Sequence, residues 1–427
     1  MHENRNNLLS SILFISYLVF FTSLIFSFRA ISSVSIGLIL IAGVLKNKIE
    51  QKRFFSRSLK SPILILCSLF FILQCISLLY TTDLHQGWKN IRLKSALVLI
   101  PLALFCCNYL DERIRKRLLN WYCILLLLAG IIAIIVAFKN YRASGDGSVF
   151  VYHALVLIYS GHAVQFSILV FIGLLHLCEM LQGKEFFANK FFHSFLILFF
   201  VIFLFLLSSK LVIIFFFIYF IFLMARFFIL KSIGKTFIAT SITALVIFSI
   251  LIFSIPNPIN SRFRDILGTN FSFLKKETFS PGDYFNGLEF RMLQWRFVPE
   301  ILQEKNAWLM GVSPGDAQTL LDQKYIATNM YIGTPERGDK GFLGYNTHNE
   351  FLESLLQTGF IGLVLFMLII GSLLKMVWER KRADLSFATI ILVIYSFSES
   401  VFETQYSLFI FLFFPLFFYQ GKISKAA

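Results

Sequence analysis

Long apolar runs recur along nearly the whole chain and are separated by shorter polar segments. A helix that crosses a lipid bilayer needs about 20 apolar residues, within a range of about 17 to 25. Twelve runs meet or approach this length, at residues 8–28, 31–45, 62–80, 95–110, 118–138, 162–182, 192–208, 211–230, 236–255, 350–374, 385–401 and 406–420. The pattern predicts an all-α polytopic membrane protein with about 12 transmembrane helices.

Lysine and arginine residues are concentrated in every second loop between these runs, as the positive-inside rule requires of cytoplasmic loops. The enriched loops contain Lys46, Lys48, Lys52, Arg53, Arg57 and Lys60; Arg113, Arg115, Lys116 and Arg117; Lys184 and Lys190; Arg226, Lys231 and Lys235; and Lys375, Arg380, Lys381 and Arg382. Both ends of the chain fall on the same side as these loops. We therefore expect a multi-pass protein with both termini in the cytoplasm.

One large polar segment, residues 256–346, lies on the opposite side. It separates transmembrane helices 1–9, residues 1–255, from transmembrane helices 10–12, residues 347–427. Within it, the stretch from Glu289 to Lys305 predicts an amphipathic helix lying on the membrane or on the bundle. Its apolar positions are Phe290, Leu293, Phe297, Val298, Ile301 and Leu302. A second helix is expected with Ser313 as N-cap, Pro314 as its first residue and Asp316 closing a capping box.

Composition and charge agree with a membrane protein. Hydrophobic residues make up 57% of the chain and charged residues only 15%, whereas a soluble domain has roughly 25% charged residues. The net charge of +15 comes from short basic clusters between apolar runs. Orientation signals and anionic lipids explain such clusters better than nucleic acid does. The six cysteines lie in or beside apolar runs and are interpreted as small core residues.

A histidine stands where the outer segment enters the tenth apolar run. Thr347 and Glu350 have the spacing of a capping box, so we expect the helix to begin at His348. The positive end of a helix dipole favours a neutral imidazole that can accept a proton. The same position attracts phosphate. The alternative is that His348 only caps the helix at the membrane interface.

Acidic and polar residues continue from this point into the membrane. Glu350, Glu353 and Gln357 form a stripe over two helical turns, and ionisable residues inside a membrane usually face a cavity. Hydration by lipid headgroups is the alternative. Gly359 and Gly362 would let a neighbouring helix approach closely.

Two further outer positions could line the same cavity. His162 opens the sixth run, and Glu399 lies near the exit of the eleventh, one turn before Glu403. Both acids could instead face water. A metal site is not expected at His162, because His153 lies nine residues away and no cysteine or acidic partner has ligand spacing.

Several cations lie on the outer side, where positive-inside sorting selects against them. They are Arg92, Lys94, Lys210, Arg262, Arg264 and Arg291. Each alone could be a solvated or snorkelling side chain. Together with His348 on the same side they suggest a diphosphate site, because guanidinium and ammonium groups bind phosphate oxygens.

The run of His348, Asn349 and Phe351, followed by Gly359 and Gly362, resembles the signature of the O-antigen ligase superfamily. That superfamily includes O-antigen ligases, O-antigen polymerases and bacterial O-linked oligosaccharyltransferases. The upstream residues Arg291 and Trp295, Glu304 and Asn306, and the turn from Gly311 to Asp316 are similar to the family's outer-loop pattern.

The resemblance implies a metal-independent, inverting glycosyltransferase without a cofactor. It would take a glycan from an undecaprenyl-diphosphate carrier at the periplasmic face of the bacterial inner membrane, with residues 256–346 as a periplasmic loop carrying short helices. His348 matches the family's proposed base and Arg291 matches an arginine that holds the diphosphate. The family often has Ser-Arg where this chain has Ser209 and Lys210, so the charge is kept but the bidentate fork is lost.

These features favour a ligase that moves a carrier-linked glycan onto a lipid acceptor such as lipid A–core. A polymerase that joins carrier-linked repeat units is the alternative within the same fold. A lipid-linked glycan flippase or transporter, or a non-catalytic assembly factor, would belong to another class. The expected partners are the undecaprenyl-diphosphate-linked glycan, a lipid or glycolipid acceptor and membrane lipids, and no nucleic acid.

Overall fold

The computed structural model describes residues 2–51, 54–55, 59–106, 111–159, 162–183, 185–230, 234–254, 257, 260–261, 264, 271–334, 336 and 338–420. Within these ranges, all regular secondary structure is helical. The α-helices are α1 His2–Ile25, α2 Arg29–Gln51, α3 Pro62–Ser77, α4 Leu84–Lys94, α5 Ala96–Pro101, α6 Glu112–Ser144, α7 Tyr152–Leu155, α8 Ala163–Gln182, α9 Lys190–Leu206, α10 Lys210–Ile229, α11 Lys235–Ser254, α13 Gly287–Glu304, α14 Ala317–Ala327, α15 Glu350–Arg380, α16 Ala383–Tyr395 and α17 Gln405–Tyr419. Shorter helical turns are η1 Leu102–Cys106, η2 Gly147–Phe150, η3 Leu157–Tyr159 and η4 Phe271–Lys275.

Each apolar run predicted from the sequence coincides with a helix, the fourth being divided between α5 and η1. Among the described residues, six helices are long and apolar enough to cross a membrane: α1, α2, α6, α8, α10 and α15. The helices α3, α9, α16 and α17 are apolar but shorter. The structure therefore supports a polytopic membrane protein, and twelve crossings remain a prediction.

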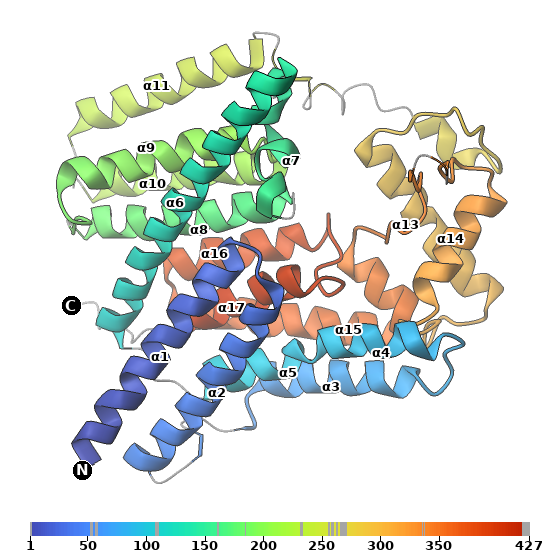
Figure 1. Ribbon diagram of the computed structural model, residues 1–427, viewed down its shortest axis with the longest axis horizontal. Coiled ribbons are helices and arrows are strands. Elements are labelled where there is room, and N and C mark those ends of the chain that lie inside the picture. The colour runs from blue at the N-terminus through green and yellow to red at the C-terminus, as the bar shows by residue number, and fades with distance from the viewer. Residues whose placement is uncertain are drawn as a thin grey trace.

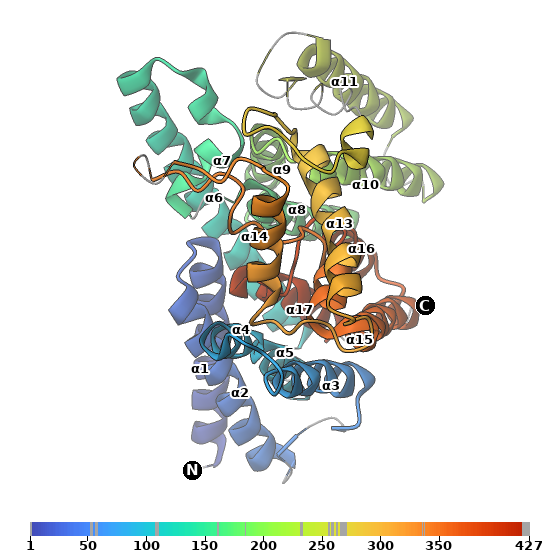
Figure 2. The ribbon, with the colours of Figure 1, turned by 90° about the vertical axis from the view of Figure 1, so that its right-hand side faces the viewer.

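The apolar helices form one bundle, and α13 and α14 lie together at one end of it (Figure 1). Figure 2 looks onto that end, with α14 and α13 in front of the bundle. A large hydrophobic core fills the bundle, and a second, smaller core fills the unit made by α13, α14 and the first turns of α15. The carboxyl-terminal helix α17 is buried on nearly all sides by other helices.

Loops that the sequence assigns to the same side meet at the same end of the bundle. At the end that carries α13, the Ser27 hydroxyl donates to the Tyr159 carbonyl at 2.8 Å. At the opposite end, Lys116 pairs with Glu185 at 2.8 Å and Arg115 pairs with Asp384 at 3.4 Å. The alternation of loops is thus reproduced by the packing, whereas the orientation in a membrane remains a prediction.

Helix α13 confirms the predicted amphipathic helix. All six of the apolar positions expected on one face are buried. They pack within the smaller core against α14 and α15, so this helix lies on the bundle. Its start was not predicted: the Asn286 side chain accepts from the Glu289 backbone N–H at 3.0 Å, and the Glu289 carboxylate accepts from the Asn286 N–H at 2.9 Å.

The prediction for the second outer helix was wrong in its first turn. Helix α14 begins at Ala317, and Asp316 is its N-cap residue. Ser313 has φ +77° and its hydroxyl accepts from the Gly315 N–H at 3.0 Å, which holds the preceding turn outside the helix. The Asp316 carboxylate accepts from the Thr82 N–H at 2.9 Å instead, so the turn docks on the loop between α3 and α4.

A loop, and not a helix, packs against Gly359 of the signature. Helix α15 is broken at Thr358 and Gly359, and Gly359 has φ +66° and ψ −162°. Backbone hydrogen bonds join the segment 308–313 to this break, from Val312 N–H to Leu356 O at 2.8 Å and from Phe360 N–H to Trp308 O at 2.9 Å. The expected helix contact at Gly359 is therefore wrong.

Glycine is required on both sides of this junction. A Cβ at Gly359 would clash with the Leu309 backbone, and a Cβ at Gly311, which has φ +72°, would clash with the Gln357 backbone. Gly362 has a different role, because a Cβ there would meet the Thr358 side chain of its own helix. The close backbone approach anchors the outer unit to α15.

Candidate active site

The predicted capping box before α15 is wrong, and His348 lies outside the helix. Helix α15 begins at Glu350, and the Asn349 side chain caps it by accepting from the Phe351 N–H at 2.9 Å. The backbone N–H groups that a Thr347 cap would accept from donate elsewhere, Asn349 N–H to Ser400 Oγ at 3.3 Å and Glu350 N–H to the Ser396 carbonyl at 2.9 Å. His348 has φ +46°, a left-handed conformation that is uncommon for a residue with a side chain and is concentrated at functional sites.

Helix α13 supports this histidine loop from the outer side. Its Trp295 indole N–H donates to the Thr347 carbonyl at 3.1 Å, and the buried Gln294 side chain donates to the Asn346 carbonyl. Arg291 lies one helical turn before Trp295. The helix that carries the predicted diphosphate-binding arginine therefore also fixes the backbone on which His348 is held.

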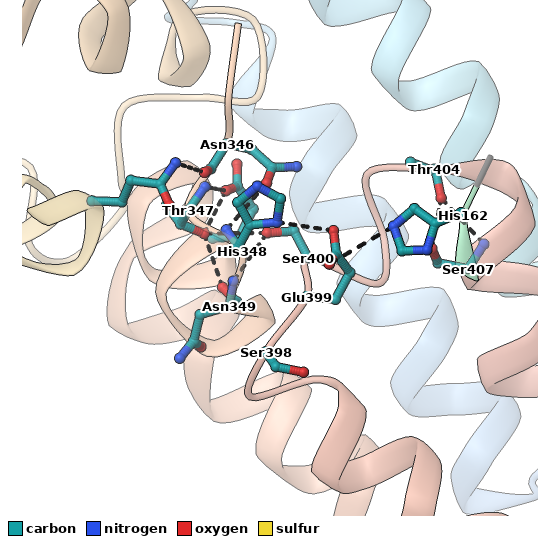
Figure 3. A network of polar contacts seen from close by, with 12 residues as sticks. His162, Asn346, Thr347, His348, Asn349, Ser398, Glu399, Ser400, Thr404 and Ser407 are labelled. Carbon is teal, nitrogen blue, oxygen red and sulfur yellow. Dashed lines mark hydrogen bonds and ion pairs between the residues drawn. The ribbon is translucent and has the colours of Figure 1, made fainter. Parts of the chain in front are cut away.

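The loop between α16 and α17 places a carboxylate between two histidines (Figure 3). One oxygen of Glu399 lies 3.1 Å from His348 Nδ1, and the other lies 4.0 Å from His162 Nε2. His162 stands just before α8, and its Nδ1 accepts from the Gln165 N–H. The side chains of His348 and Glu399 are 21% and 12% exposed, so the pair is largely shielded but still accessible.

The electrostatics of the cluster keep Glu399 ionised. Burial alone would raise the pKa of the Glu399 carboxyl, but its hydrogen bond to His348 and the positive charge of Arg291 help to hold that pKa below its ordinary value. Burial lowers the pKa of His162 and outweighs the attraction of Glu399, which favours neutral imidazole. The expected charge state at neutral pH is an anionic Glu399 beside a neutral His162.

A cavity of about 480 Å³ brings together Lys210, Arg291 and Glu399. Lys210 is the first residue of α10, after the N-cap position of Ser209. Arg291 Nε and Ser209 Oγ are buried at this cavity and, within the described residues, have no hydrogen-bond partner. The two cations and the Ser209 hydroxyl line the same cavity, where they can bind an anion. His348 is not part of the lining and reaches the cavity through Glu399.

Glu350 and Glu353 do not line this cavity. Both are buried inside the bundle, where the Glu350 carboxylate accepts from the Phe402 N–H at 2.8 Å and the Glu353 carboxylate accepts from the Gln357 amide at 2.7 Å. Glu350 ties the start of α15 to the loop before α17, and Glu353 holds Thr347 ahead of the helix. His162 is also absent from the lining, and its Nε2 atom lies 4.0 Å from the Glu399 carboxylate.

The other outer cations do not converge on the cavity. The buried Lys94 ammonium lies 2.9 Å from the Glu403 carboxylate and donates to the Gln357 side chain. Arg92 and Arg264 are exposed. Arg262 lies outside the described residues. Of the predicted set, Lys210 and Arg291 are the ones that line the cavity.

Sequence reasoning missed the partners that build the site. Ser400 contacts Thr347 Oγ1 at 3.2 Å and accepts from the Asn349 N–H at 3.3 Å. The pairing of Lys94 with Glu403 was not expected either. The spacing of Glu399 and Glu403 marked their loop as polar, but no signal in the sequence indicated which distant residues they would meet.

The comparison with known proteins supports the resemblance seen in the sequence. Residues 195–367 match a protein family described as O-antigen ligase. This match supports assignment of the chain to the O-antigen ligase superfamily, and with it a membrane enzyme of the ligase or polymerase type. The matched segment includes Lys210, Arg291 and His348, whereas His162 and Glu399 lie outside it. No curated protein matches the chain.

Proposed function

We propose that this protein is a glycan ligase of the bacterial inner membrane. It transfers a glycan from an undecaprenyl-diphosphate carrier to a lipid acceptor, such as lipid A–core, at the periplasmic face. The observation that carries the proposal is the cavity lined by Lys210 and Arg291, next to the Glu399–His348 pair. The family match supports the enzyme class, and the donor, acceptor and mechanism are our inference.

The cations would stabilise the leaving group. When the bond between the anomeric carbon and the diphosphate oxygen breaks, negative charge grows on the departing lipid diphosphate. Arg291 can offer two parallel N–H groups and Lys210 a point charge. Donors that are already in place where charge develops usually give the largest part of catalysis. The chemistry needs no metal or cofactor if these two side chains hold the diphosphate.

His348 would activate the acceptor. The acceptor hydroxyl oxygen attacks the anomeric carbon as its proton passes to the imidazole, and the lipid diphosphate leaves from the opposite face. This single displacement inverts the anomeric centre. A retaining mechanism would need a free carboxylate nucleophile. Glu399, the acid at the cavity, is engaged by His348, which favours the inverting route.

The proposed orientation follows from the two ends of the bundle. Lys210, Arg291, His348 and Glu399 belong to outer loops in the topology predicted from basic residues. Residues 256–346 would then be periplasmic and both termini cytoplasmic. An outer site suits a carrier lipid whose diphosphate headgroup lies at the membrane surface.

Glycan analysis of a strain that lacks this protein tests the function. Loss of long chains from the lipid acceptor, with long carrier-linked chains accumulating, is the expected result. Single repeat units remaining on the acceptor would instead identify a polymerase. Unchanged acceptor and carrier glycans would overturn both assignments.

A further inference from the structure

The loop that carries Glu399 is held firmly against the histidine loop. The Ser396 carbonyl accepts from the Glu350 N–H at 2.9 Å, and Ser400 contacts both Thr347 and Asn349. Farther along, Glu403 pairs with the buried Lys94. These contacts lie on both sides of Glu399, so its carboxylate is placed relative to His348 by fixed backbone and not by a mobile side chain alone.

The chemistry of a carboxylate fixes the direction of the hydrogen bond. An ionised carboxylate only accepts hydrogen bonds. The Nδ1 atom of His348, 3.1 Å from Glu399, must therefore carry the proton, and Nε2 is left with a lone pair. This is the tautomer that a general base at Nε2 needs.

The second oxygen of Glu399 faces His162. His162 Nδ1 accepts a hydrogen bond from the Gln165 backbone N–H, which can only donate. Nδ1 therefore carries no proton, and the proton of neutral His162 lies on Nε2. That N–H is on the side of Glu399, at 4.0 Å from its second oxygen. Both histidines therefore point an N–H group toward the Glu399 carboxylate.

We propose that Glu399 is the positioning residue of the active site, that it holds His348 with Nε2 as the proton acceptor, and that His162 steadies Glu399 from the opposite side. This inference rests on the proposed function of His348 as the base. Neither Glu399 nor His162 lies in the segment that matches the family, so their roles are assigned from the geometry.

The alternative is that Glu399 itself takes the proton. The groups that face Glu399 make it a poor proton acceptor. His348 before α15, His162 before α8 and Arg291 on α13 all lower the pKa of its carboxyl. Lys210 on α10 lines the same cavity. A carboxylate with a lowered pKa is a weak base, and an imidazole is better matched to neutral pH. The Glu399 charge instead stabilises the imidazolium that forms when His348 takes the proton.

The test compares the single variants His348→Gln, Glu399→Gln and His162→Gln with the double variant that combines His348→Gln and Glu399→Gln. Each is reconstituted in liposomes with carrier-linked glycan and lipid acceptor extracted from the deletion strain. Glu185→Gln is the matched control, because that carboxylate is 51% exposed, pairs with Lys116 and lies outside the family-like pattern.

We expect Glu399→Gln to lower turnover on the order of 10²- to 10⁴-fold. The acid limb of its pH–rate profile should move to lower pH, because the imidazolium loses the anion that stabilises it. His162→Gln should cause a smaller rate loss, and Glu185→Gln should change neither the rate nor the pH profile. Adding Glu399→Gln to His348→Gln should cost little more, because residues that act as a unit are non-additive.

The outcomes separate the two levels of the proposal. Near-normal turnover of His348→Gln would overturn the proposed function of that histidine. An inactive His348→Gln together with an unshifted acid limb in Glu399→Gln, or with fully additive losses in the double variant, would overturn only the positioning role of Glu399.

Discussion

The junction between the outer unit and α15 can be tested at Gly359. Its backbone has φ +66° and ψ −162°, a conformation that only glycine adopts readily. Alanine at this position would also place a Cβ against the Leu309 and Met310 backbone. Since backbone cannot rotate away as a side chain can, Gly359→Ala must displace the segment 308–313 from the helix break.

The expected cost has two parts. Holding a side-chain-bearing residue in this conformation costs about 1–3 kcal/mol. Displacing the segment would also break the hydrogen bonds from Val312 to Leu356, from Ser313 to Gln357 and from Phe360 to Trp308, each with a net value of about 0.5–1.5 kcal/mol. Together these effects predict a loss of about 3–7 kcal/mol.

Denaturant unfolding of the purified protein in one detergent measures this loss. Gly371→Ala is the control, because Gly371 lies in the same helix and an added Cβ there meets nothing within 4 Å. Gly371→Ala should leave stability unchanged or slightly raised, since alanine is the better helix former. Equal unfolding midpoints for Gly359→Ala and Gly371→Ala would refute the proposed backbone junction.

Three further predictions concern charge and topology. Arg291→Ala should lose both glycan transfer and binding of undecaprenyl diphosphate, measured with the purified protein in detergent. Arg291→Lys should restore only part of each, because lysine lacks the two parallel N–H groups of a guanidinium. Full binding by Arg291→Ala would exclude this site. Lys94→Met should destabilise the fold by about 3 kcal/mol in denaturant unfolding, because it leaves the largely shielded Glu403 carboxylate without its ammonium partner while the Gln357 amide still donates to it. Adding Glu403→Gln should recover most of that loss, and no recovery would contradict the pairing. Reporter fusions at Gly287 and Lys381 should lie on opposite sides of the membrane, and finding them on one side would overturn the topology.

The helices could be predicted from the sequence because their signal is local. Apolar runs of membrane-spanning length and the spacing of apolar residues in α13 depend only on neighbouring positions. The same is true of the family signature around His348. These features placed the helices correctly, whereas His348 lies before the helix that it was expected to begin, and its role stays a prediction.

The contacts between distant segments could not be predicted in the same way. Thr347 and Asn349 are both good N-caps, and the helix is capped by Asn349 because the N–H groups that Thr347 would accept from donate to the distant Ser400 and Ser396. Gly359 carried a small-residue signal, but only the fold shows that its partner is a loop. Lys94 was expected to contribute to an outer anion site, but it is buried and pairs with Glu403 from the loop before α17.

Turnover of His348→Gln tests the central claim most directly. Glutamine can still hydrogen-bond but cannot accept the proton at physiological pH, so the rate should fall roughly 10²- to 10⁴-fold. The assay uses reconstituted protein with saturating carrier-linked glycan and acceptor, and the exposed His85→Gln serves as control. We predict a folded His348→Gln protein with near-zero transfer and a normal His85→Gln protein. Near-normal transfer by His348→Gln would contradict the account and move the search for the base to Glu399.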